Sequence, residues 1–197
     1  MDKSKWEYKK LGEVASIING KNQKAVEDEK GIYPICGSGG IMGYANDFLC
    51  PEQTVIIGRK GNINRPIYME QKFWNVDTAF GIVANKSLLV PKFLYYFCAD
   101  FNFERLNKAV TIPSLVKSDL LKISMHIPPL SEQQHIVEEL DLLSSIIEKK
   151  KAQLNELDNL AQSLFYEMFG DPIINEKGWN IKLLSDIASF KNGLNYH

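Results

Sequence analysis

The longest regular pattern of hydrophobic and polar residues runs from Ser131 to Phe169. Apolar residues recur there in alternating steps of four and three, at Ile136, Leu140, Leu143, Ile147, Leu154, Leu157, Ala161, Leu164 and Met168, with one break at Lys150. This spacing is the a/d seam of a coiled coil. At a rise of about 1.5 Å per residue, an unbroken helix would span roughly 58 Å, more than a core element of so small a domain needs. The pattern predicts a long spacer helix.

Both ends of this helix carry sequence signals. Two prolines, Pro128 and Pro129, precede it, and Ser131 with Gln134 three residues later predicts a capping box. Gly170 suits the left-handed position after the last turn, and Pro172 forbids continuation. The helix is therefore expected to begin at Ser131 and end at Phe169.

The apolar stripe of this helix is wider than two positions per heptad. The residues that widen it are Val137, Leu142, Ile146, Leu160 and Phe165. A stripe of this width needs neighbours to cover it, so we expect a partner helix from a second copy or from a continuation of this chain. Lys150 in the seam either fixes register or belongs to a solvated charge run.

The pattern before the helix is one of short strands and turns. Apolar runs at 33–36, 54–58 and 79–84 are each bounded by Gly, Asn or Pro and predict strands. Helical spacing behind Pro91 predicts one helix within 88–107. The fold class is therefore α+β: a globular mixed α/β domain over 1–130, followed by the long coiled-coil helix over 131–169.

The opening of the chain occurs twice. Residues 179–195 align with residues 6–22, matching Trp, Lys, Leu, Ala, Ser, Asn, Gly and Asn at an offset of 173 residues. This period is too long for a solenoid and indicates a tandem duplication of the domain and its helix. Residues 170–197 are therefore expected to be a linker and the start of a second, incomplete domain.

Composition places the chain among ordinary globular proteins, with 45% hydrophobic and 24% charged residues. The sequence predicts no membrane span and no signal peptide, so we expect a cytoplasmic protein. Residues 1–130 hold 17 Lys and Arg against 13 Asp and Glu, whereas residues 131–197 hold 6 against 11. A positive domain on an acidic helix is compatible with a polyanionic partner of the domain alone.

Known catalytic patterns are missing from the sequence. Gly37 to Gly40 lacks the Gly-Lys-Ser/Thr ending of a phosphate-binding loop, the histidines fit no triad, and neither Asn-Pro-Pro-Tyr nor Asp-Pro-Pro-Tyr occurs. Cys36, Cys50 and Cys98 are widely spaced and are expected to be buried, reduced thiols. We therefore expect no catalytic residues, no metal site and no bound cofactor.

Two loops are rich in side chains that contact nucleic acids. They supply cations for phosphates, together with Arg, Asn and Gln for base edges. The residues assigned to a DNA-binding face are Lys21, Asn22, Gln23, Lys24, Arg59, Lys60, Asn62 and Arg65, with Ser38 and Gly39 as candidates for backbone contacts. Polar loops without any DNA role are the alternative.

Five motifs resemble the DNA-specificity subunit of type I restriction-modification enzymes. They are Trp6-x-x-x-x-Leu11-Gly-Glu-Val-Ala15 with Asn19-Gly20, Val55-Ile-Ile-Gly-Arg59-Lys-Gly61, Trp74-Asn-Val-Asp77-Thr-Ala-Phe80, Thr111-Ile-Pro-Ser-Leu115 and Ile127-Pro-Pro-Leu-Ser-Glu-Gln-Gln134. The last motif, which opens the long helix, is the most specific. The resemblance implies two target-recognition domains separated by antiparallel helices, each domain reading one half of a split DNA site.

The resemblance also implies a division of labour. This chain would choose the double-stranded DNA sequence, while modification (methyltransferase) and restriction subunits would supply the chemistry of S-adenosylmethionine, ATP and Mg. With one recognition domain, the chain is either a shortened piece or a natural half-length subunit, and the latter could form a homodimer through its long helix. Alternatives are the recognition fragment of a single-chain restriction-modification enzyme and a coiled-coil structural protein that binds no DNA.

Overall fold

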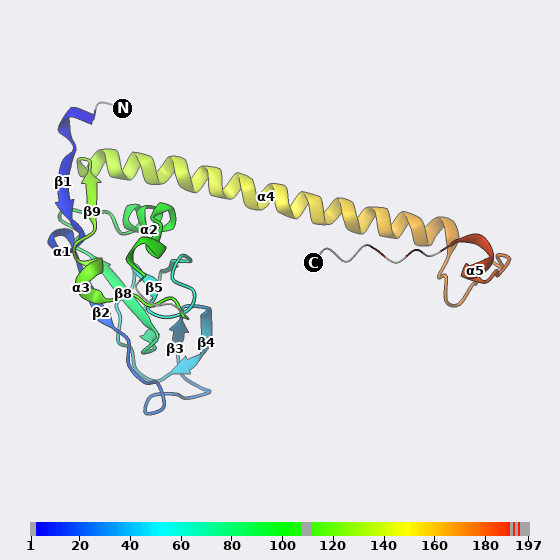
Figure 1. Cartoon of the computed structure of the whole chain (residues 1–197), viewed down its shortest axis with the longest axis horizontal. Helices are drawn as coiled ribbons and strands as arrows, with labels where there is room; N and C mark the ends of the chain where they lie inside the picture. Colours follow the sequence, from blue (N-terminus) through cyan, green and yellow to red (C-terminus); the bar gives the residue numbers. More distant parts are fainter. Residues whose placement is uncertain (1–2, 108–111, 190, 192, 194–197) are drawn as a thin grey trace. The chain divides into compact units, whose positions relative to one another are not determined.

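The computed structural model describes residues 3–107, 112–189, 191 and 193, and the chain divides into two compact units, 1–142 and 143–197 (Figure 1). The first unit holds every strand that the structure describes, and the long helix α4 (Leu130–Phe169) starts in it. Short strands in three sheets together with this long helix confirm the predicted α+β class. No helix in these described ranges is long and apolar enough to cross a membrane.

The largest sheet has four antiparallel strands. Their order is β2 (Ala15–Asn19), β8 (Ala79–Ala84), β5 (Thr54–Gly58) and β6 (Ile67–Met69). Every residue of β5 and all but one of β8 are buried. Strands covered on both faces read as continuous apolar runs, and for this reason the sequence predicts both with the bounds that the structure has.

Two smaller sheets complete the first unit. One is formed by β4 (Gly40–Ala45), β3 (Tyr33–Gly37) and β7 (Trp74–Asn75), and the other by β1 (Glu7–Lys10) and β9 (Ser124–Ile127). The short helices are η1 (Lys3–Lys5), α1 (Leu11–Val14) and α3 (Lys117–Leu120). The main core lies between the four-stranded sheet and helices α1, α2 and α3, and Val14, Ile57 and Leu94 are among its fully buried residues.

Helix α2 (Pro91–Asp100) is shorter than the predicted 88–107. Pro91 occupies its first turn, as the sequence predicts. The helix ends early because the side chain of Asn102 accepts a hydrogen bond from the backbone N–H of Glu104, at 3.0 Å, and so caps a separate 3₁₀ turn, η2 (Phe103–Leu106). The apolar spacing continues through this break, so periodicity alone could not reveal it.

The three cysteines confirm the prediction of buried, reduced thiols. All three are free and fully buried. Burial raises the pKa of the Cys36 thiol to about 11 and that of Cys50 to about 12, because a thiolate is poorly solvated in an apolar core. They therefore serve as small packing residues.

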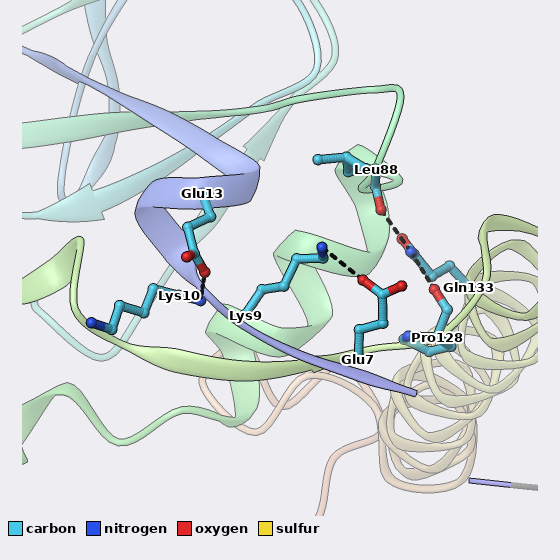
Figure 2. A network of polar contacts seen from close by, with 7 residues as sticks. All are labelled: Glu7, Lys9, Lys10, Glu13, Leu88, Pro128 and Gln133. Carbon is cyan, nitrogen blue, oxygen red and sulfur yellow. Dashed lines mark hydrogen bonds and ion pairs between the residues drawn. The ribbon is translucent and has the colours of Figure 1, made fainter. Parts of the chain in front are cut away.

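The start of α4 depends on Gln133 and not on the predicted capping box. The side chain of Gln134 donates to Glu138, one turn later, and no hydrogen bond between Gln134 and Ser131 is found among the described residues. Gln133 instead is fully buried and binds three backbone groups. Its Nε2 donates to the carbonyls of Leu88 (2.9 Å) and Pro128 (2.8 Å) (Figure 2). Its Oε1 accepts from the N–H of Val90 (2.8 Å). This amide joins the helix to the segment that leads into α2.

The next two turns of α4 are held to the domain by Val137 and Asp141, which follow Gln133 at intervals of four residues. Val137 is buried, and Asp141 accepts hydrogen bonds from Lys92 Nζ (2.8 Å) and Tyr96 Oη (2.5 Å), both on α2. Partial burial works to raise the pKa of Asp141, but these two hydrogen bonds outweigh it and hold the pKa below its usual value. One face of the first three turns is thus fixed to the domain, mostly by polar contacts.

The second unit contains the rest of α4 and the tail. Gly170 adopts φ +76° and its N–H donates to the carbonyl of Tyr166, as predicted for the residue that ends the helix. Trp179 Nε1 donates to the carbonyl of Phe169, and α5 (Leu184–Ile187) follows. The repeat positions Phe190, Asn192, Leu194 and Asn195 lie outside the described residues.

The role of Gln133 is tested by Gln133→Leu. The substitution keeps the volume but leaves two carbonyls and one N–H buried without partners, and it should lower the free energy of unfolding by about 2–4 kcal/mol. Urea denaturation measures the change. Gln134→Leu is the matched control, because Gln134 is exposed and its substitution should change stability by less than about 0.5 kcal/mol. Equal losses in the two variants would contradict the assignment.

Candidate nucleic-acid interface

The three loops that carry the predicted DNA-binding residues leave the sheets at the same edge. Strand register shows this directly, because Asn19 at the end of β2 and Gly58 at the end of β5 lie opposite Phe80 and Ala79 at the start of β8. Strand β3 runs parallel to β7, with Cys36 opposite Asn75. The segments after β2, β3 and β5 therefore all meet the 75–79 turn that links β7 to β8.

Backbone hydrogen bonds tie each loop to the 75–79 turn. The N–H of Lys21 donates to the carbonyl of Asn75 at 2.8 Å, and the N–H of Val76 donates to that of Cys36 at 3.0 Å. The carbonyl of Thr78 accepts from Arg59 at 2.8 Å and from Lys60 at 3.3 Å. Stretches more than fifty residues apart in sequence are thus fixed around one short turn.

Glycines allow this close approach. A Cβ atom at Gly20 would lie 1.7 Å from the carbonyl oxygen of Val76. A Cβ at Gly58 would lie 2.3 Å from the carbonyl oxygen of Asn62 and 2.9 Å from Cβ of Ser38. The second and third loops therefore touch each other at Gly58, and no larger residue fits there without moving backbone.

The first loop supplies exposed cations on a turn that holds its own shape. Lys21 and Lys24 are exposed, whereas the side chain of Asn22 accepts a hydrogen bond from the N–H of Lys24 at 2.9 Å. Gln23 is half-buried, and its carbonyl accepts from the N–H groups of Val26 and Glu27. Asn22 therefore has less free hydrogen-bonding capacity than its residue type suggests.

The third loop borders a small cleft. The guanidinium of Arg59 lies 5.8 Å from the centre of the Phe80 ring, and a cleft of about 300 Å³ opens beside it. Its lining residues are Asn19, Arg59, Phe80, Ser114, Leu115, Val116 and Lys117. Lys60, Asn62 and Arg65 are exposed on the same loop.

The exposed cations of this edge are free for an external partner. The side chains of Lys21, Lys24, Lys60 and Arg65 form no ion pair with any residue that the structure describes. Asp77 is an exposed carboxylate on the 75–79 turn itself. Unpaired cations around a polar turn can contact a polyanion without first breaking internal salt bridges.

Two parts of this edge were missed as site residues. Thr78 holds the third loop, and Lys117 donates from Nζ to the carbonyl of Ile17 at 2.6 Å beside the cleft. The segment that begins at Ile112 also belongs here, because the N–H of Leu115 donates to the carbonyl of Arg59 and the N–H of Gly61 donates to that of Pro113. The available signal was that 74–80 and 111–115 are motifs with no assigned role; Thr111 itself lies outside the described residues.

Within 3–107 and 112–189, no group of three His, Cys, Asp or Glu side chains could hold a metal ion. What the arrangement offers is cations, amides and backbone N–H groups on loops fixed to a rigid sheet, which are the groups that bind phosphates and base edges.

Comparisons with known proteins agree on one family. A sequence model of the type I restriction modification DNA specificity domain matches residues 3–159. A putative type I restriction enzyme specificity subunit, S.HindORF215P of Haemophilus influenzae, is 31% identical over 152 residues, which cover 74% of this chain and 39% of the relative. The specificity subunit of the type I restriction enzyme EcoDI of Escherichia coli is 27% identical over 158 residues, covering 79% and 35%.

Solved structures show the same fold. The S subunit of a type I restriction-modification system from M. genitalium superposes with a TM-score of 0.62 at 18% identity, over 92% of this chain and 48% of that one. The chain therefore spans less than half the length of each of these relatives.

Gly58→Ala tests whether close packing holds the loops together. The added methyl group collides with backbone at Asn62 and should lower the free energy of unfolding by about 2 kcal/mol or more, measured by thermal denaturation. Gly39→Ala is the matched control, because a Cβ there has no other atom within 4 Å and should leave the melting temperature nearly unchanged. A Gly58→Ala protein as stable as the wild type would show that the loops are not packed in this way.

Proposed function

The chain belongs to the family of type I restriction modification DNA specificity domains, and from this premise we propose that it recognises one half of a split site in double-stranded DNA. The single observation that carries the proposal is the convergence on the 75–79 turn of two loops rich in cations and amides and of the Ser38-Gly39 loop. The first unit would then position these loops rigidly against the DNA.

The residue types of the interface suggest separate roles. Arg59, Arg65 and Asn62 can make paired hydrogen bonds to guanine or adenine edges. Lys21, Lys24 and Lys60 suit phosphates, while Asn22, Gln23, Ser38 and Gly39 would contribute further polar or backbone contacts. Because phosphate contacts are insensitive to sequence, the arginines and Asn62 are the better candidates for specificity.

The proposal makes this chain the non-catalytic part of a larger enzyme. It would dock modification and restriction subunits, which would hold S-adenosylmethionine, ATP and Mg. Both curated relatives described above are named as specificity subunits, and this supports such a role for the chain.

Helix α4 supports a partner helix as part of the same function. Its large predicted seam residues beyond the first unit are exposed, from 47% at Leu164 to 62% at Met168, with Leu143 and Ile147 at 55%. Ile136 and Leu140, nearer the domain, are half-buried. A helix in water does not leave so many large apolar side chains uncovered. We therefore propose that a second copy pairs with this stripe and that the two domains read two half-sites at a fixed separation.

Arg59→Ala tests the DNA-binding face. If Arg59 reads a base, the substitution should weaken binding to the preferred duplex by about 1–3 kcal/mol and relax sequence preference. If it contacts only phosphate, the slope of log K against log salt should fall by about one unit. Fluorescence anisotropy across a salt series measures both quantities.

Lys86→Ala is the control for Arg59→Ala. Lys86 is an exposed cation just after the opposite end of β8. The substitution therefore removes the same charge from the opposite edge of the sheet. Its affinity and salt slope should match those of the wild type. Identical behaviour of the two variants would remove Arg59 from the interface.

The partner helix is tested by solution mass. Changing both Leu143 and Leu157 to Asp places charges in the proposed helix pair and should convert a dimer to a monomer in light scattering across a concentration series. Ser145→Asp with Asn159→Asp adds the same charge at polar positions outside the stripe and should leave the dimer intact. A wild-type chain that stays monomeric at all concentrations would contradict pairing of two copies.

A further inference from the structure

Two adjacent large apolar residues are exposed on the hairpin that carries Ser38 and Gly39. Ile41 is 56% exposed and Met42 is 61% exposed, both on β4 next to the turn. In a regular strand, neighbouring side chains point to opposite faces, so one of the two would be expected to face the core. Here neither does.

A β-bulge causes this double exposure. Cys36 pairs with Ile41, but Ile35 pairs with Gly43, so Met42 is an extra residue without a partner across the ladder. Bulges re-aim side chains and occur often beside functional sites. The bulge therefore turns both apolar side chains outward while Cys36, on the partner strand, stays fully buried.

This hairpin tip adjoins the DNA-binding face. The Cβ position of Gly37 lies 3.7 Å from the sulfur of Met42 and 4.0 Å from Oγ1 of Thr78, so Met42 is beside the 75–79 turn. The tip is open, because Cβ positions at Gly39 and Gly40 have no other atom within 4 Å.

We propose that Ile41 and Met42 read bases by apolar contact with thymine methyl groups in the major groove. This inference rests on the proposed function, since it assigns a contact within the same interface. A two-stranded β-ribbon fits the major groove, where the thymine methyl is the apolar feature that marks a base pair.

The surroundings of the tip favour DNA over a protein partner. Two side chains offer far less apolar area than the roughly 800 Å² that each partner buries in a standard protein interface, whereas one or two side chains suffice for a base contact. The flanking loops carry the unpaired cations of Lys21 and Lys60. Farther along β4 the backbone is paired, because Glu27 bridges to Ala45 and the N–H of Asp28 donates to the carbonyl of Tyr44, whose side chain is 48% exposed.

The test starts with selection of duplexes from a randomised library by the full chain. Deoxyuridine then replaces each thymine of the selected sequence in turn, which removes only a methyl group. Loss of one buried methyl should weaken wild-type binding about fourfold at one or two positions. The double variant Ile41→Ser with Met42→Ser should bind the thymine duplex more weakly and show no further loss with uracil at those positions.

Ile32→Ser is the matched control. Ile32 is 75% exposed and precedes β3 at the other end of the same hairpin, so this variant should keep the uracil effect of the wild type. A selected sequence whose binding ignores every thymine-to-uracil change, or an equal uracil effect in the double variant, overturns the inference and leaves the proposed function standing. Failure of the wild type to bind any duplex at low salt overturns both.

Discussion

The interface depends on backbone hydrogen bonds to one short turn. The 75–79 turn accepts from Lys21, Arg59 and Lys60 and donates to Cys36, and thereby holds three loops that the chain reaches at widely separated points. Because the bonds use main-chain atoms, the side chains of these loops are not needed for their position. The fold can therefore vary the exposed side chains of these loops while keeping the edge of the sheet from which the loops leave.

Helix α4 uses different chemistry for contacts inside and outside its own domain. Toward the domain it presents the buried Val137 together with Gln133 and Asp141, whose side-chain hydrogen bonds have fixed directions. Beyond the first unit its stripe is aliphatic, and aliphatic contacts place fewer constraints on geometry. A polar anchor holds the first turns of α4 on the domain, whereas an apolar seam suits association with a separate helix.

The sequence predicted correctly those elements that one local signal determines. Buried strands β5 and β8 and the end of α4 at Gly170 follow from apolar runs and from the left-handed preference of glycine. Prediction failed where a polar side chain bonds backbone groups that periodicity does not reveal: Asn102 caps a separate turn after α2, and Gln133 bonds the segment before α2. Loop composition identified candidate residues at one edge of the sheet. The position of Thr78 between the loops and the bulge at Met42 arise from strand register, and loop composition carries no information about register.

The segment that occurs twice, at 6–22 and 179–195, shows which features of structure are set by local sequence and which by tertiary contacts. Helices α1 and α5 are both four residues long, each is preceded and followed by extended residues, and each closes with an N–H donated to its first carbonyl. Their burial differs completely: Leu11 is 1% exposed and Leu184 is 59% exposed. Local sequence thus sets the conformation, and burial requires a partner such as the segment after α3, where Leu11 and Gly12 donate to the carbonyls of Ile123 and Leu121. The tail has the same local conformation as the opening of the first domain. Its apolar residues need a partner of the same kind to be covered.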